Sequence, residues 1–352
     1  MRKIKAKRIV IKVGTNVLTK QNGTLNTERI GNIAKEIAGL KKEFIIVTSG
    51  AIGCGCKELS IKQRPRDIIL RQACAAIGQS ILMNAYNNMF SKEGIKTAQI
   101  LLTYDDFSDR KRYLNLRNSI NKLISLGIVP IINENDAIST AEIDMSFGDN
   151  DRLSALVASK MEADLLIMLS DIDGLYNKNP KTNRDAKVIK EVREITKEIE
   201  RITAGKGSAM AIGGMKSKIE AAKITMQSGC SLVIINGKIK KPITRVLKGE
   251  ELGTLFIPKK ALKNKERWII HAKTKGRIII NKRAEEILLK KKASLLSVGI
   301  ERIEGSFSKR DVVEINNFAK AMTDYSSEEL KNLRGKKGIV AIKHENIVII
   351  NK

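Results

Sequence analysis

The chain has 352 residues, enough for two domains, with 42% hydrophobic residues and a formal net charge of +27. No window of about twenty apolar residues is present to span a bilayer, and the four cysteines and two histidines lack zinc-site spacing, so we expect a cytoplasmic protein with free thiols, no membrane association and no metal bound by its own residues. The positive charge invites a nucleic-acid hypothesis, but it is spread along the whole chain, and aromatic residues that could stack on bases make up only 4%.

The N-terminal segment, residues 1–14, combines a basic start with a short apolar run that Lys12 interrupts. The run is too short for a secretory leader and has no small-residue cleavage site. We interpret it as the lead into a first buried strand.

From residue 8 to about 236 the chain alternates between two kinds of segment. Nearly continuous apolar runs predict strands covered on both faces, at 8–14, 44–50, 96–103, 127–136, 163–171 and 230–237. Amphipathic stretches between them predict helices, at 28–42, 68–90, 111–126, 151–162 and 215–228. This alternation favours an α/β domain over residues 1–257, with a central, mainly parallel sheet in a three-layer αβα arrangement.

Polar residues follow several of these predicted strands. They are Gly14-Thr15, Thr48-Ser49-Gly50, Asn133 to Asp136, and Ser170-Asp171. In parallel sheets the ligand site gathers at the carboxyl ends of the strands, so we expect these scattered residues to converge in space.

The pattern changes after residue 257. Residues 258–275 contain a proline and many charges but no apolar period, which favours a linker. From 276 to 352 the chain offers short strand candidates and one helix candidate, AEEILLKK, which indicates a small β-rich domain of roughly 75 residues.

Lys12 is the first candidate for phosphate chemistry. The chain has no G-x-x-x-x-G-K-[ST] motif. A buried strand tolerates a lysine poorly unless its ammonium meets an anion, and Gly14 nearby lets backbone amides approach a phosphate. The alternative is a surface lysine on an edge strand.

A second candidate opens the predicted helix 215–228, where Gly213 and Gly214 precede two lysines, Lys216 and Lys218. Paired glycines at a helix N-terminus present free amides and the positive end of the dipole to an anion, and a lysine in the first turn can reach a transferred phosphoryl group. Glycines before helices are also common without any such role.

Carboxylates and amides are concentrated in two short strings, Asn133-Glu134-Asn135-Asp136 and Gly148-Asp149-Asn150-Asp151. They could hold the ammonium and carboxylate of an amino acid, or orient a magnesium ion. Capping of the helix at 151–162 explains one of these residues, and a solvated loop plus a cap is the alternative reading. Asp171 is placed to contact catalytic lysines or a metal-bound nucleotide, or simply to form a turn.

Taken together, these strings resemble the amino acid kinase family, and within it the glutamate 5-kinases. The matching strings are VIKVGTNVL (10–18), IVTSGAIGCG (46–55), INENDAIST (132–140), GDNDRLSALVA (148–158), LSDIDGLY (169–176), IGGMKSKIEAA (212–222) and GTLF (253–256). They cover about the first 260 residues in family order, and the remainder resembles a PUA domain, a small β-barrel found in RNA-modifying enzymes.

The resemblance implies roles for individual residues. Lys12 and Lys218 would stabilise the charge on the transferred phosphoryl group, with Asp171 organising the lysines. The implied ATP contacts are Lys12, Gly14, Ser170, Asp171, Ile212, Gly213, Gly214, Met215, Lys216, Ser217 and Lys218. The implied glutamate contacts are Ser49, Gly50, Asp136, Asp149 and Asn150.

The resemblance also implies the reaction, which is transfer of the ATP γ-phosphoryl group, with Mg²⁺, to the γ-carboxylate of L-glutamate. It further implies a place at the start of proline synthesis, feedback inhibition by L-proline, a homo-oligomeric assembly and a reductase partner for the acyl phosphate. Two alternatives stay open. One is a related kinase with another substrate, such as aspartate or N-acetylglutamate, and the other is an RNA-binding or regulatory protein that uses the C-terminal domain.

Overall fold

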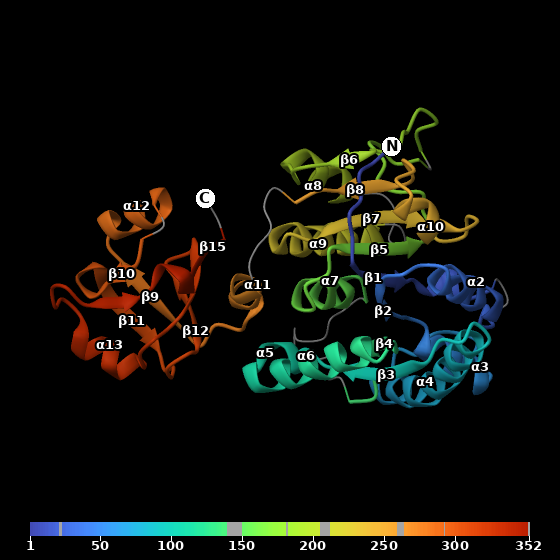
Figure 1. Ribbon diagram of the computed structural model, residues 1–352, viewed down its shortest axis with the longest axis horizontal. Coiled ribbons are helices and arrows are strands. Elements are labelled where there is room, and N and C mark those ends of the chain that lie inside the picture. The colour runs from blue at the N-terminus through green and yellow to red at the C-terminus, as the bar shows by residue number, and fades with distance from the viewer. Residues whose placement is uncertain are drawn as a thin grey trace. The chain divides into compact units, whose positions relative to one another are not determined.

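The structure is a computed structural model that describes residues 1–20, 23–138, 150–180, 182–204, 212–258, 264–291 and 293–350. The chain divides into two compact units (Figure 1). The larger unit comprises Met1–Asp106 and Lys111–Ala261, and the smaller unit comprises Phe107–Arg110 and Leu262–Lys352.

The larger unit is built on a sheet that has eight strands within the described ranges, in the order β3-β4-β2-β1-β5-β7-β8-β6. The strands are β1 Arg8–Val13, β2 Glu43–Val47, β3 Thr97–Leu102, β4 Val129–Glu134, β5 Leu165–Ser170, β6 Glu191–Val192, β7 Ser231–Asn236 and β8 Thr254–Phe256. All of the pairings are parallel except the antiparallel contact between β7 and β8. The predicted mainly parallel sheet is therefore confirmed.

Helices connect these strands. They are α1 Thr15–Leu18, α2 Thr27–Ala38, α3 Ala51–Glu58, α4 Ile68–Ser91, α5 Asp105–Ser108, α6 Arg110–Ser125, α7 Asn150–Lys160, α8 Lys197–Ala204, α9 Ile212–Ser228 and α10 Pro242–Leu247. Helix α9 begins three residues earlier than its predicted start, so Gly213 and Gly214 lie inside its first turn. Helix α3 was not predicted, because its alanines, glycines and cysteines give no apolar period.

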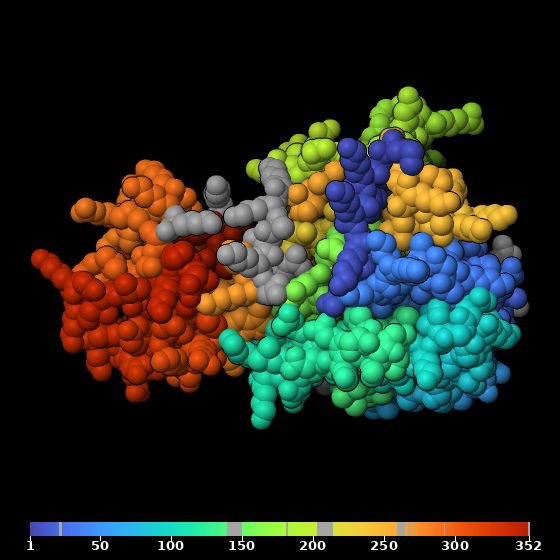
Figure 2. All heavy atoms as spheres, viewed as in Figure 1, coloured from blue at the N-terminus to red at the C-terminus, as the bar shows by residue number. Residues whose placement is uncertain are grey.

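The N-terminal residues are tied to the end of the larger unit's sequence. The backbone N–H of Arg2 donates to the carbonyl of Gly249 at 2.7 Å, and its guanidinium donates to the carbonyl of Leu252 at 2.5 Å. In Figure 2 these dark-blue atoms lie beside the yellow-orange α10–β8 segment. The contacts fix the chain before it enters β1.

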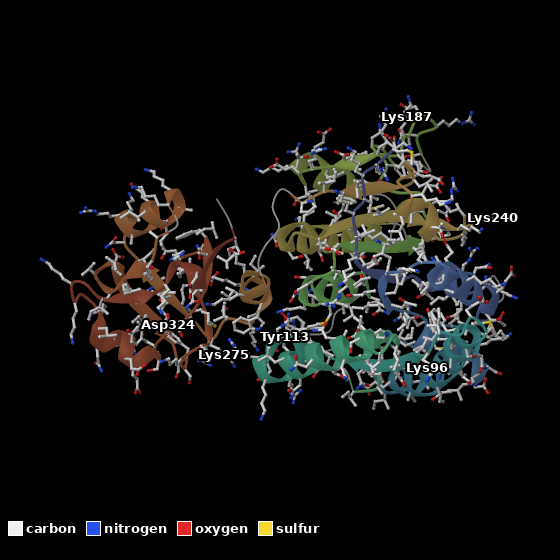
Figure 3. The ribbon with its side chains drawn as sticks, in the orientation of Figure 1. Lys96, Tyr113, Lys187, Lys240, Lys275 and Asp324 are labelled. Atoms are coloured by element: carbon white, nitrogen blue, oxygen red, sulfur yellow. The ribbon has the colours of Figure 1, made fainter. Side chains whose placement is uncertain are left out.

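Positive side chains are distributed over the surface of the larger unit rather than gathered at one point. Lys96, Lys187 and Lys240 belong to different segments, and all three are exposed (Figure 3). The helices among the described residues include none long and apolar enough to cross a membrane. The four cysteines are free thiols, and each is buried.

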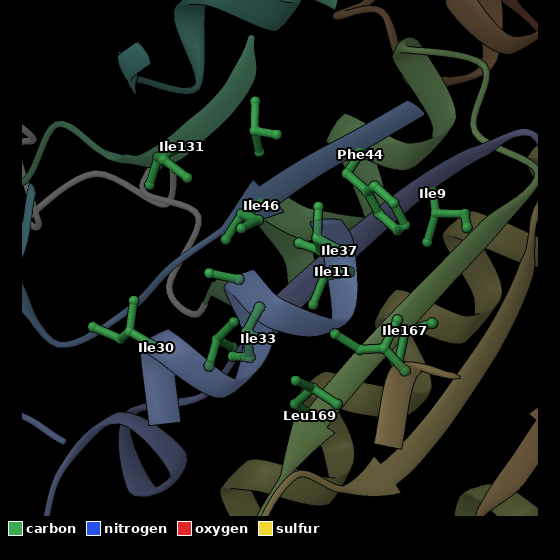
Figure 4. Packing of buried hydrophobic residues seen from close by; sticks show 14 of the residues in the cluster. Ile9, Ile11, Ile30, Ile33, Ile37, Phe44, Ile46, Ile131, Ile167 and Leu169 are labelled. Atoms are coloured by element: carbon green, nitrogen blue, oxygen red, sulfur yellow. The ribbon is translucent and has the colours of Figure 1, made fainter. Parts of the chain in front are cut away.

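The core of the larger unit lies between α2 and the middle of the sheet. Ile33 and Ile37 of α2 pack with Ile11 of β1 and Ile46 of β2 (Figure 4). Successive side chains of a strand point to opposite faces of the sheet. The side chain of Lys12 therefore points away from α2, toward the face of the sheet where α7 lies.

The smaller unit contains a five-stranded sheet in the order β11-β9-β12-β13-β15 and a two-stranded sheet of β10 and β14, counted over its described residues. The elements are α11 Asn264–His271, β9 Gly276–Ile280, α12 Lys282–Lys290, β10 Leu295–Leu296, η1 Ser297–Gly299, β11 Ile300–Gly305, β12 Val312–Ile315, β13 Ala319–Met322, α13 Ser327–Leu333, β14 Val340–Ile342, η2 His344–Asn346 and β15 Ile347–Ile349. Ile278, Val313 and Leu330 belong to a buried cluster of its own. The expected small β-rich domain is confirmed, with α13 as a helix that the composition did not predict.

The segment expected to be a linker, 258–275, contains helix α11, and that expectation is corrected. Trp268, Ile269 and Ile270 of this helix are buried. The ammonium of Lys320 donates to the carbonyls of Ile270 at 2.9 Å and Ala272 at 3.0 Å, which satisfies backbone acceptors at the end of the helix. The sequence did not predict this helix, because three consecutive apolar residues within a charged stretch show no helical periodicity.

Candidate active site

The polar residues that follow the parallel strands do converge, and Asn150 at the start of α7 joins them. Its amide Nδ2 lies 2.8 Å from the Thr48 carbonyl oxygen, 3.0 Å from Ser49 Oγ and 3.1 Å from Asn133 Oδ1. These partners come from the carboxyl ends of β2 and β4. Asn150 Oδ1 is buried and accepts no hydrogen bond within the described part of the chain.

Two lysines meet one buried carboxylate beside this junction. Lys12 Nζ lies 2.7 Å from Asp151 Oδ1, and Lys218 Nζ lies 3.0 Å from Asp151 Oδ2. Asp151 is fully buried, while Lys12 and Lys218 are 6% and 9% exposed. Burial acts to raise the pKa of Asp151, but the two ammonium groups outweigh it and hold that pKa below its usual value. The two ammonium groups are thus held at the same carboxylate, and the cluster of three groups has a net positive charge.

The first two turns of α9 complete this cluster. Ser217 Oγ donates to Asp151 Oδ2 at 2.9 Å, and Lys218 Nζ also donates to the Gly214 carbonyl at 3.0 Å. Met215 is half-buried and Lys216 is exposed. Backbone N–H groups at the start of a helix have no partner within the helix, so the first turn of α9 is suited to binding an anion.

Asp171 lies at the carboxyl end of β5, next to Ser170. It accepts hydrogen bonds from Asn16 Nδ2 at 2.8 Å and from Ser170 Oγ at 3.2 Å. Burial acts to raise its pKa, but these hydrogen bonds and the charge of Lys218 outweigh burial and lower that pKa. The carboxylate is therefore ionised close to the lysine cluster.

The expectation that Asp171 organises the two lysines is corrected, because Asp151 makes both ion pairs. Sequence reasoning gave Asp151 no role of its own beyond membership of a string in which one residue would cap the helix. In the structure it is the second residue of α7 and its side chain is fully buried. A carboxylate and two lysines that are 139 and 67 residues away from it give no local signal. The one clue in the sequence was Lys12 itself, because a lysine in a buried strand needs an anion beside its ammonium group.

A cleft of about 930 Å³ opens beside Asn150. One side carries the acidic and amide groups of Asn133, Glu134 and Asp136, and Ser49 and Gly50 also line it. Gly50 has a φ of +99°, a left-handed conformation that suits glycine at this strand-to-helix turn. The α3–α4 side is basic, and its cationic lining residues are Lys57, Lys62, Arg64 and Arg71.

Asp136 is the most strongly perturbed carboxyl group of the cleft. Burial, and then the charge of Glu134, raise its pKa to about 6, while Arg64 and Arg71 act in the opposite direction. A bound cation such as an ammonium group would stabilise the ionised form of this carboxylate.

Most of the predicted site residues therefore lie in two adjoining places. Ser49, Gly50, Asp136 and Asn150 line the cleft, and Lys12, Ser217 and Lys218 gather around Asp151. Gly14 hydrogen bonds to the carbonyl of Leu169 in β5, at 3.1 Å. Asp149 lies outside the described residues, and for Ile212 and Gly213 the structure describes only their place in the first turn of α9.

The chain is similar to known families and relatives over most of its length. Residues 7–236 match the Amino acid kinase family, and residues 276–345 match the PUA domain. A protein of Methanosarcina barkeri named glutamate 5-kinase is 51% identical over 343 residues, covering 93% of this chain and 89% of the relative. Relatives with the same name from Caldanaerobacter subterraneus and Pelobacter propionicus are 44% and 41% identical, covering 93% and 98% of this chain and 90% and 98% of the relatives.

Solved structures support the fold alone, because their sequences are distant. Carbamate kinase from Giardia lamblia bound to AMP-PNP superposes with a TM-score of 0.54 at 17% identity, covering 72% of this chain and 98% of that one. Isopentenyl phosphate kinase of T. acidophilum, in a product complex, gives a TM-score of 0.50 at 19% identity, covering 71% and 99%. The family matches and the full-length relatives show that the chain belongs to the amino acid kinase family, in the group named glutamate 5-kinases, and that a PUA domain follows the kinase domain in the sequence.

Proposed function

We propose that the protein transfers the γ-phosphoryl group of ATP to the γ-carboxylate of L-glutamate, giving L-glutamyl 5-phosphate and ADP. The observation that carries this proposal is the buried Asp151 holding Lys12 and Lys218 near a cleft that Ser49, Asp136 and Asn150 line. The names of the full-length relatives support the choice of glutamate.

The transfer needs no general base, because a carboxylate is already a nucleophile at neutral pH. One γ-carboxylate oxygen of glutamate forms a bond to the γ-phosphorus as the bond from that phosphorus to the β,γ-bridging oxygen breaks, and ADP leaves with the electron pair. Catalysis then consists of positioning and of neutralising charge on the transferred group.

The two lysines supply that neutralisation. Asp151 fixes both ammonium groups before the substrates arrive, so little reorganisation is needed when negative charge develops on the phosphoryl oxygens. The N-terminal end of α9, with Gly214 and Ser217, binds the phosphates of ATP, and Ser170 and Asp171 contact the nucleotide from the end of β5.

The cleft holds glutamate. Asp136 pairs with the substrate ammonium, and Asn150, whose Oδ1 is buried without a donor, and Ser49 orient the chain of the substrate toward Lys12. Asp149 is proposed as a further contact from sequence alone.

The nucleotide is proposed to arrive as its Mg²⁺ complex. Within the described ranges, no group of three or more His, Cys, Asp or Glu side chains is arranged to hold a metal ion, and Mg²⁺ in kinases is bound largely through substrate phosphates and water. The ion would add to the neutralisation that the lysines provide.

The proposed setting is the first step of proline synthesis, in the cytoplasm. L-proline would inhibit at or near the glutamate cleft, since it shares the α-carboxylate and the amino nitrogen of glutamate. A homo-oligomeric assembly and a reductase that consumes the labile acyl phosphate complete the proposal.

Trapping of the acyl phosphate tests the proposal. Hydroxylamine converts it to a hydroxamate, which is measured with L-glutamate, L-aspartate or N-acetyl-L-glutamate as substrate, together with MgATP. Hydroxamate with glutamate alone is expected. Product with one of the others would assign a different kinase specificity.

The second candidate function is RNA binding through the PUA domain, with an inactive kinase domain. The complete cluster of Lys12, Asp151 and Lys218 argues against inactivity, because an unused pair of buried lysines would only destabilise the fold. No turnover with any amino acid, together with salt-dependent binding of RNA to the full chain, would favour this alternative.

A further inference from the structure

Arg71 occupies an unusual position in the cleft. It lies in the first turn of α4 and lines the cleft that Asp136 and Asn150 also line. Its Nε is buried and has no hydrogen-bond partner among the described residues. Within 4 Å, neither Arg71 nor the neighbouring Arg64 forms an ion pair with a carboxylate of the described chain.

A buried guanidinium donor without a partner is costly, and such donors commonly serve a ligand. The guanidinium is a planar fork that matches a carboxylate with two parallel hydrogen bonds. Arg71 and Asp136 both line this cleft, and the charge of Arg71 acts to lower the pKa of Asp136.

These relations match the head of an α-amino acid, in which the ammonium and the carboxylate are attached to the same carbon and require neighbouring partners of opposite charge. We infer that Arg71 binds the α-carboxylate of the substrate, with Arg64 beside it, while Asp136 binds the ammonium. This inference rests on the proposed function and names the residue that makes the cleft specific for an amino acid rather than for a simple carboxylate.

The assignment divides the cleft into two ends. The α-carboxylate is held at the basic α4 end, and the γ-carboxylate extends past Asn150 toward Lys12. A substrate without the α-carboxylate, such as 4-aminobutyrate, keeps the ammonium and the reacting carboxylate but leaves Arg71 unpaired. The wild-type protein is therefore expected to discriminate strongly against 4-aminobutyrate, and Arg71 is expected to be the cause.

The test compares Arg71→Met and Arg71→Lys with the wild type, using glutamate and 4-aminobutyrate as competing substrates. Arg71→Met removes the guanidinium that pairs with the α-carboxylate, so kcat/KM for glutamate is expected to fall about a hundred-fold. The kcat/KM for 4-aminobutyrate, which has no α-carboxylate, is expected to stay within about three-fold of the wild-type value. Arg71→Lys keeps the charge but loses the fork, so about ten-fold is expected. The KM for ATP should not change in either variant.

Arg66 offers a control, because it lies in the connection just before α4, five residues from Arg71, is exposed and does not line the cleft. Arg66→Met is expected to keep the wild-type ratio of the two substrates. If Arg71→Met lowered both substrates equally, the role would be structural and the inference would be wrong. If Arg71→Met failed to fold, an unchanged KM for glutamate in Arg71→Lys would overturn the inference equally well.

Calorimetric binding separates this inference from the proposed reaction. Wild-type protein that binds glutamate but forms no hydroxamate would refute the reaction, and loss of that binding in Arg71→Met would still support the arginine's role. Retained glutamate binding in Arg71→Met would overturn the role of Arg71 whatever the activity.

Discussion

At the scale of single residues, the buried cluster of Lys12, Asp151 and Lys218 carries the account. Two ammonium groups share one fully buried carboxylate, so the cluster has an uncompensated positive charge, which suits it to the anionic phosphoryl group of the proposed reaction. The sequence predicted both lysines from their setting beside glycines. It could not predict Asp151 as their common partner, because that relation depends on how β1, α7 and α9 pack.

Removal of either lysine should affect the chemical step. Lys12→Met and Lys218→Met are each expected to lower kcat on the order of a hundred-fold or more, by analogy with the loss of one preorganised donor. Steady-state kinetics with saturating MgATP and glutamate measure the effect. Lys223→Met on the surface of α9, where Lys223 pairs with Glu200, is the control that should keep wild-type turnover. Unchanged turnover in either active-site variant would rule out its role.

Asp151→Asn should damage both stability and activity. The folded pKa of Asp151 lies below its usual value, so its ionised form stabilises the fold at neutral pH, and this contribution is lost as the pH falls through the folded pKa. The amide leaves two buried ammonium groups without their partner, and we expect a loss of about 3–5 kcal/mol in the free energy of unfolding. Denaturant unfolding at pH 7 measures it. A variant as stable as the wild type would contradict the assigned ion pairs.

Asp136 predicts a pH dependence of glutamate binding. Its pKa of about 6 means that the carboxylate is protonated, and so loses its attraction for the substrate ammonium, below that pH. We expect kcat/KM for glutamate to fall about ten-fold for each pH unit below about 6, and Asp136→Asn to remove this dependence at a lower plateau.

Unfolding would not explain that loss. Because the folded pKa is raised above the unfolded value, protonation of Asp136 itself stabilises the free protein as the pH falls from 7 toward 5. Thermal melts over the same range therefore serve as the control. A flat profile of kcat/KM between pH 5 and 7 would contradict the role of this carboxylate.

At the scale of elements, the close crossing of α3 and α4 shapes the cleft. A Cβ at Gly55 would lie 1.8 Å from the carbonyl oxygen of Cys74, and a Cβ at Gly78 would lie 1.8 Å from that of Ala51. No side chain fits at either position without separating the helices. The crossing therefore fixes both Gly50, at the start of α3, and Arg71, in α4.

Gly55→Ala is expected to lower the melting temperature and to raise the KM for glutamate, because the helices must move apart. Overpacking of this kind costs typically about 1–3 kcal/mol. Gly31→Ala in α2 is the matched control, since its Cβ would make an ordinary 3.5 Å contact with Met89 Sδ and the change should stabilise the helix by up to about 1 kcal/mol. Wild-type stability in Gly55→Ala would show that the crossing is looser than the structure indicates.

The elements also show what the sequence could and could not predict. Six strands of the larger sheet were predictable because each is a short apolar run, as in β5, which is buried along its whole length. The expected burial on both faces is wrong for β3, which lies at the edge of the sheet and is buried only at Leu102. Strands β6 and β8 were missed because they have only two and three residues. Helix α3 was not predictable, because its packing depends on glycines that contact a helix later in the chain rather than on an apolar stripe. Helix α11 was missed because its buried residues form a single triplet in a charged stretch.

At the scale of the whole molecule, the net charge of +27 does not by itself identify a nucleic-acid-binding protein. Exposed lysines such as Lys96 and Lys187 belong to separate segments of the kinase domain, whereas the charges that matter for the proposed chemistry are the buried Lys12 and Lys218. The PUA domain has its own hydrophobic cluster, so its fold does not depend on the core of the kinase domain. The catalytic account therefore concerns the kinase domain alone.

The most direct test of that account follows an oxygen atom. Glutamate labelled with ¹⁸O in both oxygens of its γ-carboxylate is incubated with the protein, MgATP and hydroxylamine, and the released phosphate is analysed by mass spectrometry. If a γ-carboxylate oxygen attacks the phosphorus of ATP, hydroxylamine then displaces phosphate from the acyl carbon, and each phosphate formed in this way carries one ¹⁸O. Phosphate without ¹⁸O, released at the rate of ATP consumption, would show hydrolysis of ATP by water and would contradict the proposed transfer.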